Sequence, residues 1–299
     1  MKHRFYRIRK RLLFAVLALL MVVTMLPLQA FAADNVRDMA DLPDGVIHID
    51  SSNLSDWDGK VLTGTNRSAN QYLQVSGVTL NLTIRDLVIN RANDNIGYFS
   101  AIEVLNGATL NLTLEGTSTL TGYEGGAGIH VPSGSTLTIT ENSTGTLNAN
   151  GGNSRGGAAG IGAIAGNVLF GTSTPPTVRD VGKIVIAGGT VNAKGGTYRF
   201  NYADQNGAAG IGGSYGASGA VIEITGGTVN ATGGAAAAGI GGGTNGSVAS
   251  VTVSGGTVTA TKGTMKNMSG QVVYNRDAAA IGNGYSNVCR LKALCRAAI

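Results

Sequence analysis

Residues 226–242, which read GGTVNATGGAAAAGIGG, decide the fold of this chain. A short alternating segment stands between two glycine pairs, and a run of small residues then leads to a single isoleucine. The small-residue segment recurs, at intervals of 27, 32, 50, 29 and 41 residues, around Ile102, Ile129, Ile161, Ile211, Ile240 and Ile281. The alternating segment recurs around Leu120, Leu147, Val191, Val229 and Val258. Self-similarity at this coarse period is typical of solenoids, propellers and arrays.

The segments between the glycines alternate polar and aliphatic residues, as in 79–84 (TLNLTI), 109–114 (TLNLTL) and 136–140 (TLTIT). A period of two is typical of half-buried strands. Glycine at the corners supplies the positive φ that other residues resist. Each repeat then holds about three strands and three corners, which predicts an all-β chain, a single-stranded right-handed parallel β-helix (solenoid) of about six coils. Propeller blades need about 40 residues, more than the shortest interval offers.

The chain divides into four predicted segments. Residues 1–32 combine six basic residues, an apolar run and an A-x-A site, the pattern of a cleavable secretory signal peptide. Residues 33–60 are rich in aspartate and are expected to form an acidic leader or cap, and the β-helix should occupy 61–287. The basic tail, 288–299, is either a short capping helix or a truncated or frame-altered end. We therefore expect a secreted or cell-surface protein with no membrane contact after signal cleavage.

Removal of the signal peptide would change the charge balance. The whole chain carries 22 basic and 17 acidic residues, a net charge of +5. Without residues 1–32, 16 basic residues stand against the same 17 acidic ones, a net charge of −1. No basic stripe remains, which argues against nucleic acid as a partner. Both cysteines, Cys289 and Cys295, lie in the tail, so the coils must be stabilised by hydrogen bonds and packing rather than by disulfides.

Three insertions interrupt the repeats, at 163–182, 197–206 and 263–277. In solenoids such insertions emerge as loops from one face, which is often the binding face. The insertion 197–206 is the richest in aromatic and charged side chains, and aromatic rings pack well against sugar faces. Its candidate ligand-binding residues are Tyr198, Arg199, Phe200, Tyr202 and Asp204.

The strands of the GGTVNATGG type place hydroxyl and amide side chains on their outer side. Aligned by repeat, these side chains are Thr119/Thr121, Thr146/Asn148/Asn150, Thr190/Asn192/Lys194, Thr228/Asn230/Thr232 and Thr257/Thr259/Thr261. Two interpretations stay open. Threonine favours strands and asparagine ladders stabilise stacked coils. Alternatively, the columns form a flat platform for a polymer such as a glycan chain, or for ice, and Asn192, Thr228 and Asn230 then join the candidate ligand-binding residues.

With GGTVNATGG (226–234), AAGIGGG (237–243) and GATLNLTLEGTSTLTG (107–122), the chain resembles the glycine-rich β-helix modules of Gram-positive, clostridial-type secreted and cell-surface proteins. Some of these modules are carbohydrate-binding domains with a pectate-lyase-like fold. The resemblance covers roughly residues 60–287. It implies a non-enzymatic module that binds polysaccharide or cell-wall glycan, or that acts in adhesion. The alternatives are a structural stalk or spacer of a larger surface protein, and a polysaccharide lyase or hydrolase.

Enzymatic cleavage of a polysaccharide would need converging catalytic groups. The candidates on strands are Glu103 with Glu115, or Arg85 with Asp86. The corner at Asn106-Gly107 should place the two glutamates on different faces, so no catalytic residue is predicted.

The sequence predicts no metal ligand and no cofactor, and it leaves calcium open as the one ion the chain could bind. His48 and His130 are far apart in sequence, and His130 replaces the last glycine of a corner, where we expect it to be exposed. Residues 93–95 (NDN) have oxygen ligands for calcium, but the same triplet is an ordinary turn.

Overall fold

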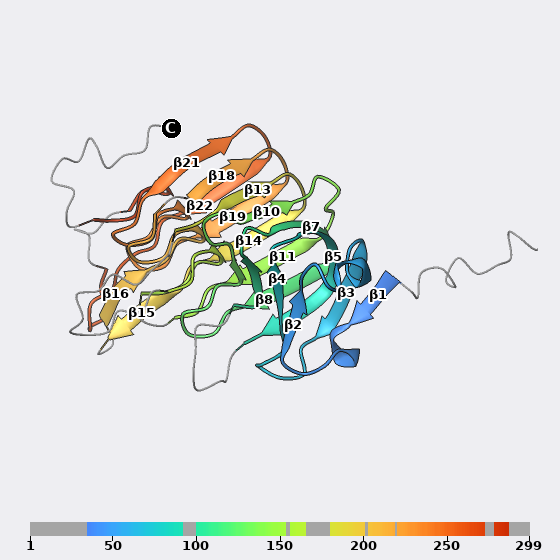
Figure 1. Cartoon of the computed structure of the whole chain (residues 1–299). Helices are drawn as coiled ribbons and strands as arrows, with labels where there is room; N and C mark the ends of the chain where they lie inside the picture. Colours follow the sequence, from blue (N-terminus) through green and yellow to red (C-terminus); the bar gives the residue numbers. More distant parts are fainter. Residues whose placement is uncertain are drawn as a thin grey trace, which may run out of the picture. The chain divides into compact units, whose positions relative to one another are not determined.

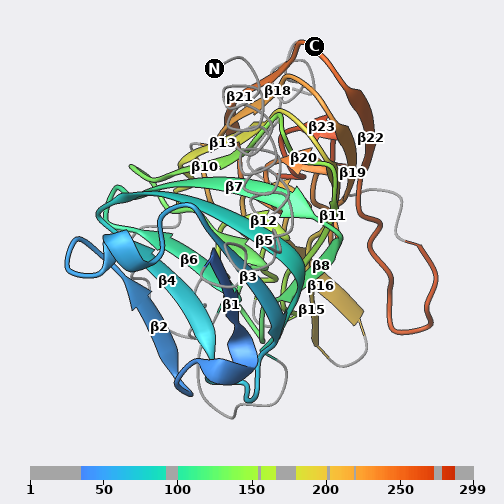
Figure 2. The ribbon, with the colours of Figure 1, turned by 90° about the vertical axis from the view of Figure 1, so that its right-hand side faces the viewer.

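Three ladders of parallel strands run along the molecule, and the coils contribute short strands to each ladder in turn (Figures 1 and 2). The computed structural model describes residues 35–91, 100–153, 156–165, 180–200, 203–218, 220–272 and 278–286. Arg37–Ile299 forms one compact unit, and the fold is described for this unit. The predicted fold class is confirmed, because the strands of successive coils pair in parallel as a β-helix.

The first ladder contains the longest strands. Its members are β3 (Lys60–Thr65), β5 (Thr79–Asn90), β7 (Thr109–Glu115), β10 (Thr136–Ile139), β13 (Lys183–Ile186), β18 (Ala220–Ile224) and β21 (Val248–Val253). The second ladder contains the predicted TVNA-type strands. Its members are β8 (Thr117–Thr121), β11 (Thr146–Asn150), β14 (Thr190–Lys194), β19 (Thr228–Thr232) and β22 (Thr257–Thr261). β5 joins both ladders into one 13-stranded sheet.

The third ladder is a separate sheet of eight strands. They are β2 (Val46–Ile49), β4 (Tyr72–Ser76), β6 (Ile102–Leu105), β9 (Ile129–His130), β12 (Ile161–Gly162), β17 (Ile211–Gly212), β20 (Ile240–Gly241) and β23 (Ile281–Gly282). The remaining elements are β1 (Val36–Asp38), two 3-10 helices, η2 (Met39–Asp41) and η3 (Leu54–Asp56), and an antiparallel hairpin of β15 (Thr197–Phe200) and β16 (Ala203–Gly207).

Eight strands in the third ladder exceed the six coils expected from the repeats. The six predicted isoleucines all lie in this ladder and are register partners. The two additional strands are β2, which falls within the predicted leader, and β4. They read VIHI and YLQVS, without the A-A-G-I-G pattern of the later coils, so the repeat pattern did not reveal them.

The corner between the first and second ladders forms inside β5. Its first half pairs with β7 and its second half with β8. Asp86 has a φ of 50° at this corner, and its Oδ1 accepts a hydrogen bond from the backbone N–H of Thr117 in the next coil (2.8 Å). Asp86 therefore stabilises the turn of the coil that follows it.

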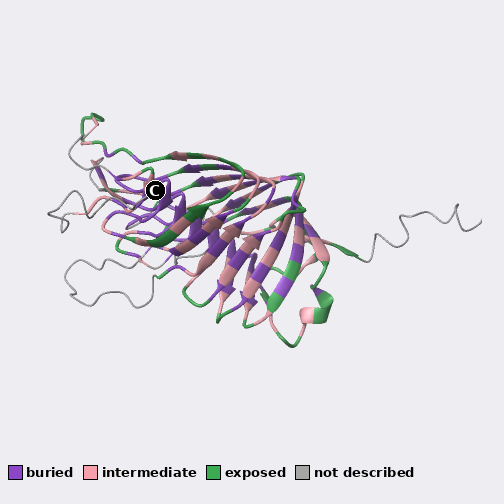
Figure 3. Ribbon diagram, turned by 90° about the horizontal axis from the view of Figure 1, so that it is seen from above, coloured by how far each residue is buried: buried purple, intermediate pink, exposed green. Residues whose placement is uncertain are grey.

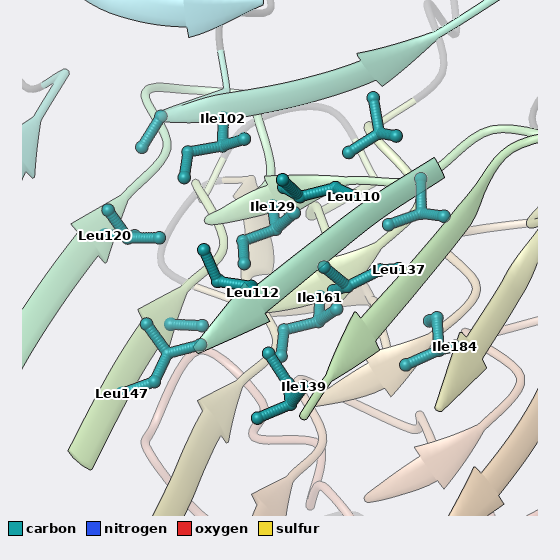
Figure 4. Packing of buried hydrophobic residues seen from close by; sticks show 14 of the residues in the cluster. Ile102, Leu110, Leu112, Leu120, Ile129, Leu137, Ile139, Leu147, Ile161 and Ile184 are labelled. Carbon is teal, nitrogen blue, oxygen red and sulfur yellow. The ribbon is translucent and has the colours of Figure 1, made fainter. Parts of the chain in front are cut away.

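The inner faces of the ladders form continuous columns of aliphatic side chains (Figure 4). Figure 3 shows the alternation of buried and more accessible residues along each strand. In the third ladder, the central isoleucines from Ile102 to Ile240 are fully buried. In the first ladder, the aligned residues Leu110, Leu137, Ile184 and Ile222 are fully buried as well. Burial of each such side chain contributes about 1.5–3 kcal/mol relative to exposure. Stacking is therefore the main source of stability.

The alignment of Leu120 with Leu147, predicted from the repeats, is wrong by two residues. Leu120 pairs with Ala149, and Leu147 pairs with Ser118. A shift of two leaves the inner and outer faces unchanged, since side chains alternate with a period of two. Ser118 is buried, and its hydroxyl accepts a hydrogen bond from the backbone N–H of Leu87 (3.1 Å), which explains why a serine is tolerated there.

A close approach of the second and third ladders requires the glycine that precedes four of the six central isoleucines, at Gly128, Gly160, Gly210 and Gly239. A Cβ added to Gly160 would lie 2.6 Å from the carbonyl oxygen of Ala149 and 2.7 Å from the backbone nitrogen of Lys194. Gly210 and Gly239 meet the equivalent atoms one and two coils later. Backbone atoms cannot move aside as side chains do, so any larger residue would push the second and third ladders apart.

We predict that Gly160→Ala lowers the free energy of unfolding by at least about 3 kcal/mol, the upper end of ordinary overpacking costs. The matched control is Gly134→Ala, where φ is +85° but no atom lies within 4 Å of the added Cβ. That control should lose about 1–2 kcal/mol from backbone conformation alone. Urea denaturation followed by circular dichroism measures both. Equal losses would contradict the close-approach argument.

Candidate functional site

The outer side of the second ladder is a polar face, defined here as the outward side chains of β8, β11, β14, β19 and β22. Its first column, in register, is Thr117, Thr146, Thr190, Thr228 and Thr257. The second is Thr119, Asn148, Asn192, Asn230 and Thr259, and the third is Thr121, Asn150, Lys194, Thr232 and Thr261. The predicted side chains do face outward, but β8 is shifted by two residues from its predicted alignment, so Thr117 joins the first column and Thr119 and Thr121 lie in the second and third. Lys194 is the single charged residue of the face.

An amide ladder runs along the middle column of the polar face. Asn230 donates from Nδ2 to the Oδ1 of Asn192 (2.9 Å), and Asn192 donates in the same way to Asn148 (2.9 Å). A side-chain amide has two N–H donors and two acceptor lone pairs. Asn192 therefore retains one N–H and one lone pair that these two bonds do not use. The ladder serves the stacking of coils and still leaves hydrogen-bonding capacity on the outside.

The insertion at 197–206 forms the hairpin β15–β16, which projects beside the ends of β14 and β19 (Figures 1 and 2). Its strands pair with a register shift between Tyr198 and Arg199. Arg199 forms an ion pair with Asp204 across the hairpin (2.7 Å), and its side chain is 65% exposed whereas that of Asp204 is 4% exposed. Among the other candidates in this segment, Tyr198 is half-buried, and Tyr202 and the side chain of Phe200 lie outside the described part.

Asp204 also holds the next insertion against the hairpin. Its Oδ2 accepts a hydrogen bond from the backbone N–H of Lys266 (3.0 Å), and its own N–H donates to the carbonyl of Lys266 (2.8 Å). Both carboxylate oxygens are thus engaged within the protein. Met265, beside Lys266, is buried against Ala235 and Ala236. The two insertions therefore form one lateral projection, which sequence reasoning anticipated only as loops on a common face. Most of the insertion 163–182, namely 166–179, lies outside the described residues.

A second polar row lies on the outer side of the third ladder. His48, Gln74, Glu103 and His130 are register partners on β2, β4, β6 and β9. Gln74 donates from Nε2 to the Oε2 of Glu103 (2.9 Å). Burial raises the pKa of the Glu103 carboxyl, and the hydrogen bond from Gln74 partly offsets this effect. Sequence analysis missed this row, although each member directly follows an inward aliphatic residue.

His130 is buried, with 9% of its surface exposed, and the expectation of an exposed corner histidine is wrong. It does occupy the position of the corner glycine, since it pairs with Gly162. Burial lowers the pKa of His130 from 6.5 to about 4. The imidazole is therefore neutral at physiological pH.

Nearby, Arg91 and Tyr72 form a buried cation–π contact. The guanidinium carbon of Arg91 lies 4.2 Å from the centre of the Tyr72 ring, and Arg91 is 1% exposed. The positive charge of Arg91 also lowers the pKa of Glu103 slightly, against the larger effect of burial. The Glu103 carboxyl thus accepts a hydrogen bond from Gln74 of the preceding coil and is influenced by the charge of Arg91.

The fold separates the first candidate catalytic pair and gives the members of the second structural roles. Glu103 lies in the third ladder and Glu115 in the first, as predicted from the intervening corner. Arg85 pairs with Glu115 through its guanidinium (Nε to Oε2, 2.6 Å), and Asp86 caps the corner described above. Each of these charged groups thus has a partner within the protein, which for Glu103 is the amide of Gln74.

Within the described residues, no group of three or more His, Cys, Asp or Glu side chains gathers closely enough to hold a metal ion. The possible calcium triplet, residues 93–95, lies outside the described part, as do Cys289 and Cys295. In the same described ranges, no helix is long and apolar enough to cross a membrane.

Comparison with known proteins supports the fold. A family model described as a beta helix repeat matches residues 184–215, 222–244 and 251–285. Each matched stretch begins in the first ladder and ends just after the third, so it corresponds to one coil. The second half of the chain is thus similar to a β-helix repeat in sequence as well as in structure. No curated protein and no solved structure is similar enough to give a match.

We predict that His130 makes stability depend on pH. Its folded pKa is about 4, below the ordinary value of 6.5. The stabilisation is therefore complete above pH 6.5 and is lost as the pH falls toward 4, because the unfolded chain then binds the proton more tightly. The loss is on the order of 3 kcal/mol. Urea denaturation of the protein and of His130→Gln between pH 7 and 4 measures it.

The informative quantity is the difference in unfolding free energy between the two proteins. Carboxyl groups such as Glu103 titrate in both proteins, so their contributions largely cancel in the difference. The advantage of the wild-type protein over His130→Gln should shrink as the pH falls below 6.5. A difference that stays constant from pH 7 to 4 would show that His130 titrates normally in the folded state.

Proposed function

We propose that this protein is a secreted, non-enzymatic β-helix module that binds polysaccharide or cell-wall glycan through its polar face and hairpin, in a role such as surface adhesion. The observation that carries the proposal is the polar face itself. Three columns of hydroxyl and amide groups follow one another in register over five coils. The signal-peptide pattern of residues 1–32 supports export.

The outer side of the first ladder provides a comparison within the same molecule. It carries ion pairs between neighbouring strands, Arg85 with Glu115 and Lys183 with Glu223 (2.9 Å). The polar face has a single charged side chain, Lys194, and its other fourteen outward groups are hydroxyls and amides. Sugars present mainly hydroxyl groups, which exchange hydrogen bonds with both types of side chain. The polar face is therefore the better match to a glycan.

The strand spacing gives the face a regular pitch. Parallel strands lie roughly 4.8 Å apart, and outward side chains two residues apart on one strand are separated by about 6.6 Å. None of the fifteen outward side chains is buried. A polymer chain lying on such a face would meet equivalent groups at each coil. Tyr198 on the neighbouring hairpin offers an aromatic surface for a sugar ring.

A structural stalk is the second candidate, and the amide ladder favours it. Amides that bond to one another at 2.9 Å stabilise stacked coils whether or not a ligand exists. A stalk would not require the face to be accessible or specific. Binding measurements with variants that keep the fold therefore separate the two functions.

We predict that replacing Thr228 by Val and Asn230 by Leu weakens retention on the bound polysaccharide at least tenfold, or about 1.4 kcal/mol. The matched control replaces Thr109 by Val and Asn111 by Leu, on the outer side of the first ladder. Asn111 donates to the Oδ1 of Asn81 at the same distance, 2.9 Å, so both variants lose an equivalent amide bond. Affinity electrophoresis against neutral, acidic and cell-wall glycans measures retention.

In thermal melts, both double variants should remain folded and lose similar stability. Loss of retention confined to the second-ladder variant supports the binding face. If the wild-type protein is retained by none of the glycans, or if both variants bind equally well, the polar face is not a glycan site and the stalk remains.

We also predict that the protein releases no new reducing ends and no unsaturated sugars from pectin, alginate or xylan, with or without calcium. The reason is geometric, because Glu103 and Glu115 belong to different sheets and cannot act across one groove. Reducing-sugar and absorbance assays test this. Release that disappears in Glu103→Gln would overturn the non-enzymatic function.

A further inference from the structure

Four basic residues gather where the polar face meets the lateral projection. We call this set, Lys194, Arg199, Lys262 and Lys266, the basic rim. All four are exposed. Lys194 ends β14 in the third column of the polar face, between Asn150 and Thr232 of the neighbouring coils. Lys262 directly follows β22, at the same end of the ladder.

Asp204 brings the other two rim residues together. It pairs with Arg199 across the hairpin at 2.7 Å and accepts a hydrogen bond from the backbone of Lys266 at 3.0 Å. The hairpin itself begins three residues after Lys194. The rim residues thus come from different coils and lie up to 72 positions apart in the sequence. The buried carboxylate of Asp204 holds Arg199 and the backbone of Lys266 close together.

The rim has an excess of positive charge. In the described part of 180–286 the acidic residues are Asp180, Asp204 and Glu223. Glu223 pairs with Lys183 on the first ladder, and Asp180 precedes β13 on the same side of the coil. Of these three, only Asp204 contacts the rim, where it offsets the charge of Arg199. Among the described residues of this range, the rim therefore has a net positive charge, beside a polar face whose other side chains are hydroxyls and amides.

We propose that the basic rim selects an anionic polysaccharide, whose acidic groups meet the three lysines while its hydroxyls contact the polar face. This inference rests on the proposed function and names the class of glycan. Lysine ammonium groups are compact charges on flexible stems, so they can follow carboxylates or sulfates spaced along a polymer. Exposed charges of this kind increase encounter rates and are screened by salt.

A nucleic acid is the other common polyanion. Proteins that bind single strands combine a charged groove with several aromatic platforms on which bases stack. The hairpin strands carry the aromatic residues Tyr198 and Phe200, but the adjacent polar face carries hydroxyls and amides rather than rings. These groups favour a sugar polymer, and nucleic acid is included as an outcome of the test.

The experiment compares polymers that share one backbone and differ in charge: hydroxyethyl cellulose, carboxymethyl cellulose and cellulose sulfate, with single-stranded DNA as a fourth probe. Retention of the full chain is measured by affinity electrophoresis and by titration at several salt concentrations. We expect at least tenfold stronger binding to a charged cellulose than to the neutral one. This preference should fall at least about tenfold between roughly 0.05 and 0.5 M salt.

The variant Lys194→Gln/Lys262→Gln/Lys266→Gln should lose most of the preference, and the corresponding triple Lys→Arg variant should keep it. Lys183→Gln is the control on the first ladder and should bind within twofold of the wild-type protein. Circular dichroism melts establish that each variant is folded. The two charged celluloses distinguish carboxylate from sulfate as the recognised group.

Equal, salt-insensitive binding to neutral and charged celluloses would overturn the inference while the polysaccharide module stands. So would a charge preference that the triple Gln variant retains, or stronger binding to DNA than to either charged cellulose. Failure to bind any of the celluloses also overturns it. Failure of the wider glycan panel as well would reject the proposed function itself.

Discussion

In-register stacking of parallel coils is the constraint on which the rest of this structure depends. Side chains alternate along each strand, so a slip of one residue would carry Val229 outward and Thr228 into the core. The glycines before the central isoleucines add a second restraint, because at Gly160 two ladders approach closely enough to exclude a Cβ. The aliphatic core and the polar face are consequences of the same register. A change of register would therefore disrupt both at once.

Much of this could be predicted from the sequence, since a repeating backbone repeats its local requirements. The central isoleucines and the outward Thr/Asn columns follow from periodicity alone. The first coils could not be counted in this way, because β2 and β4 form the same ladder with ordinary alternating residues instead of the A-A-G-I-G segment of the later coils. His130 shows a further limit. Its place in the coil was predictable, but its burial depends on neighbouring segments that the repeat does not specify.

The composition of the candidate site could be predicted from the sequence, but the contacts between its segments could not. A segment with aromatic and charged residues stands out at 197–206, but its sequence does not reveal that Asp204 is buried or that it binds Lys266, 62 residues away. Contacts between two insertions depend on which coils are adjacent and on how each loop leaves its strand. The row of His48, Gln74, Glu103 and His130 had a clearer signal. Each follows an inward aliphatic residue, and aligning the coils on that residue would have found it.

The composition of the polar face is not dictated by the stability of the fold. In a solenoid each coil contacts mainly its neighbours, so outward positions contribute through local pairs. The first ladder satisfies such pairs with ions, as in Arg85–Glu115, and with amides, as in Asn111–Asn81. Ion pairs and amide pairs between neighbouring coils are therefore both compatible with the stacking of this β-helix. The second ladder uses hydroxyls and amides at every outward position except Lys194, over five coils. Because stacking alone would accept charges there, the scarcity of charged side chains on this face supports the proposal that it contacts a ligand.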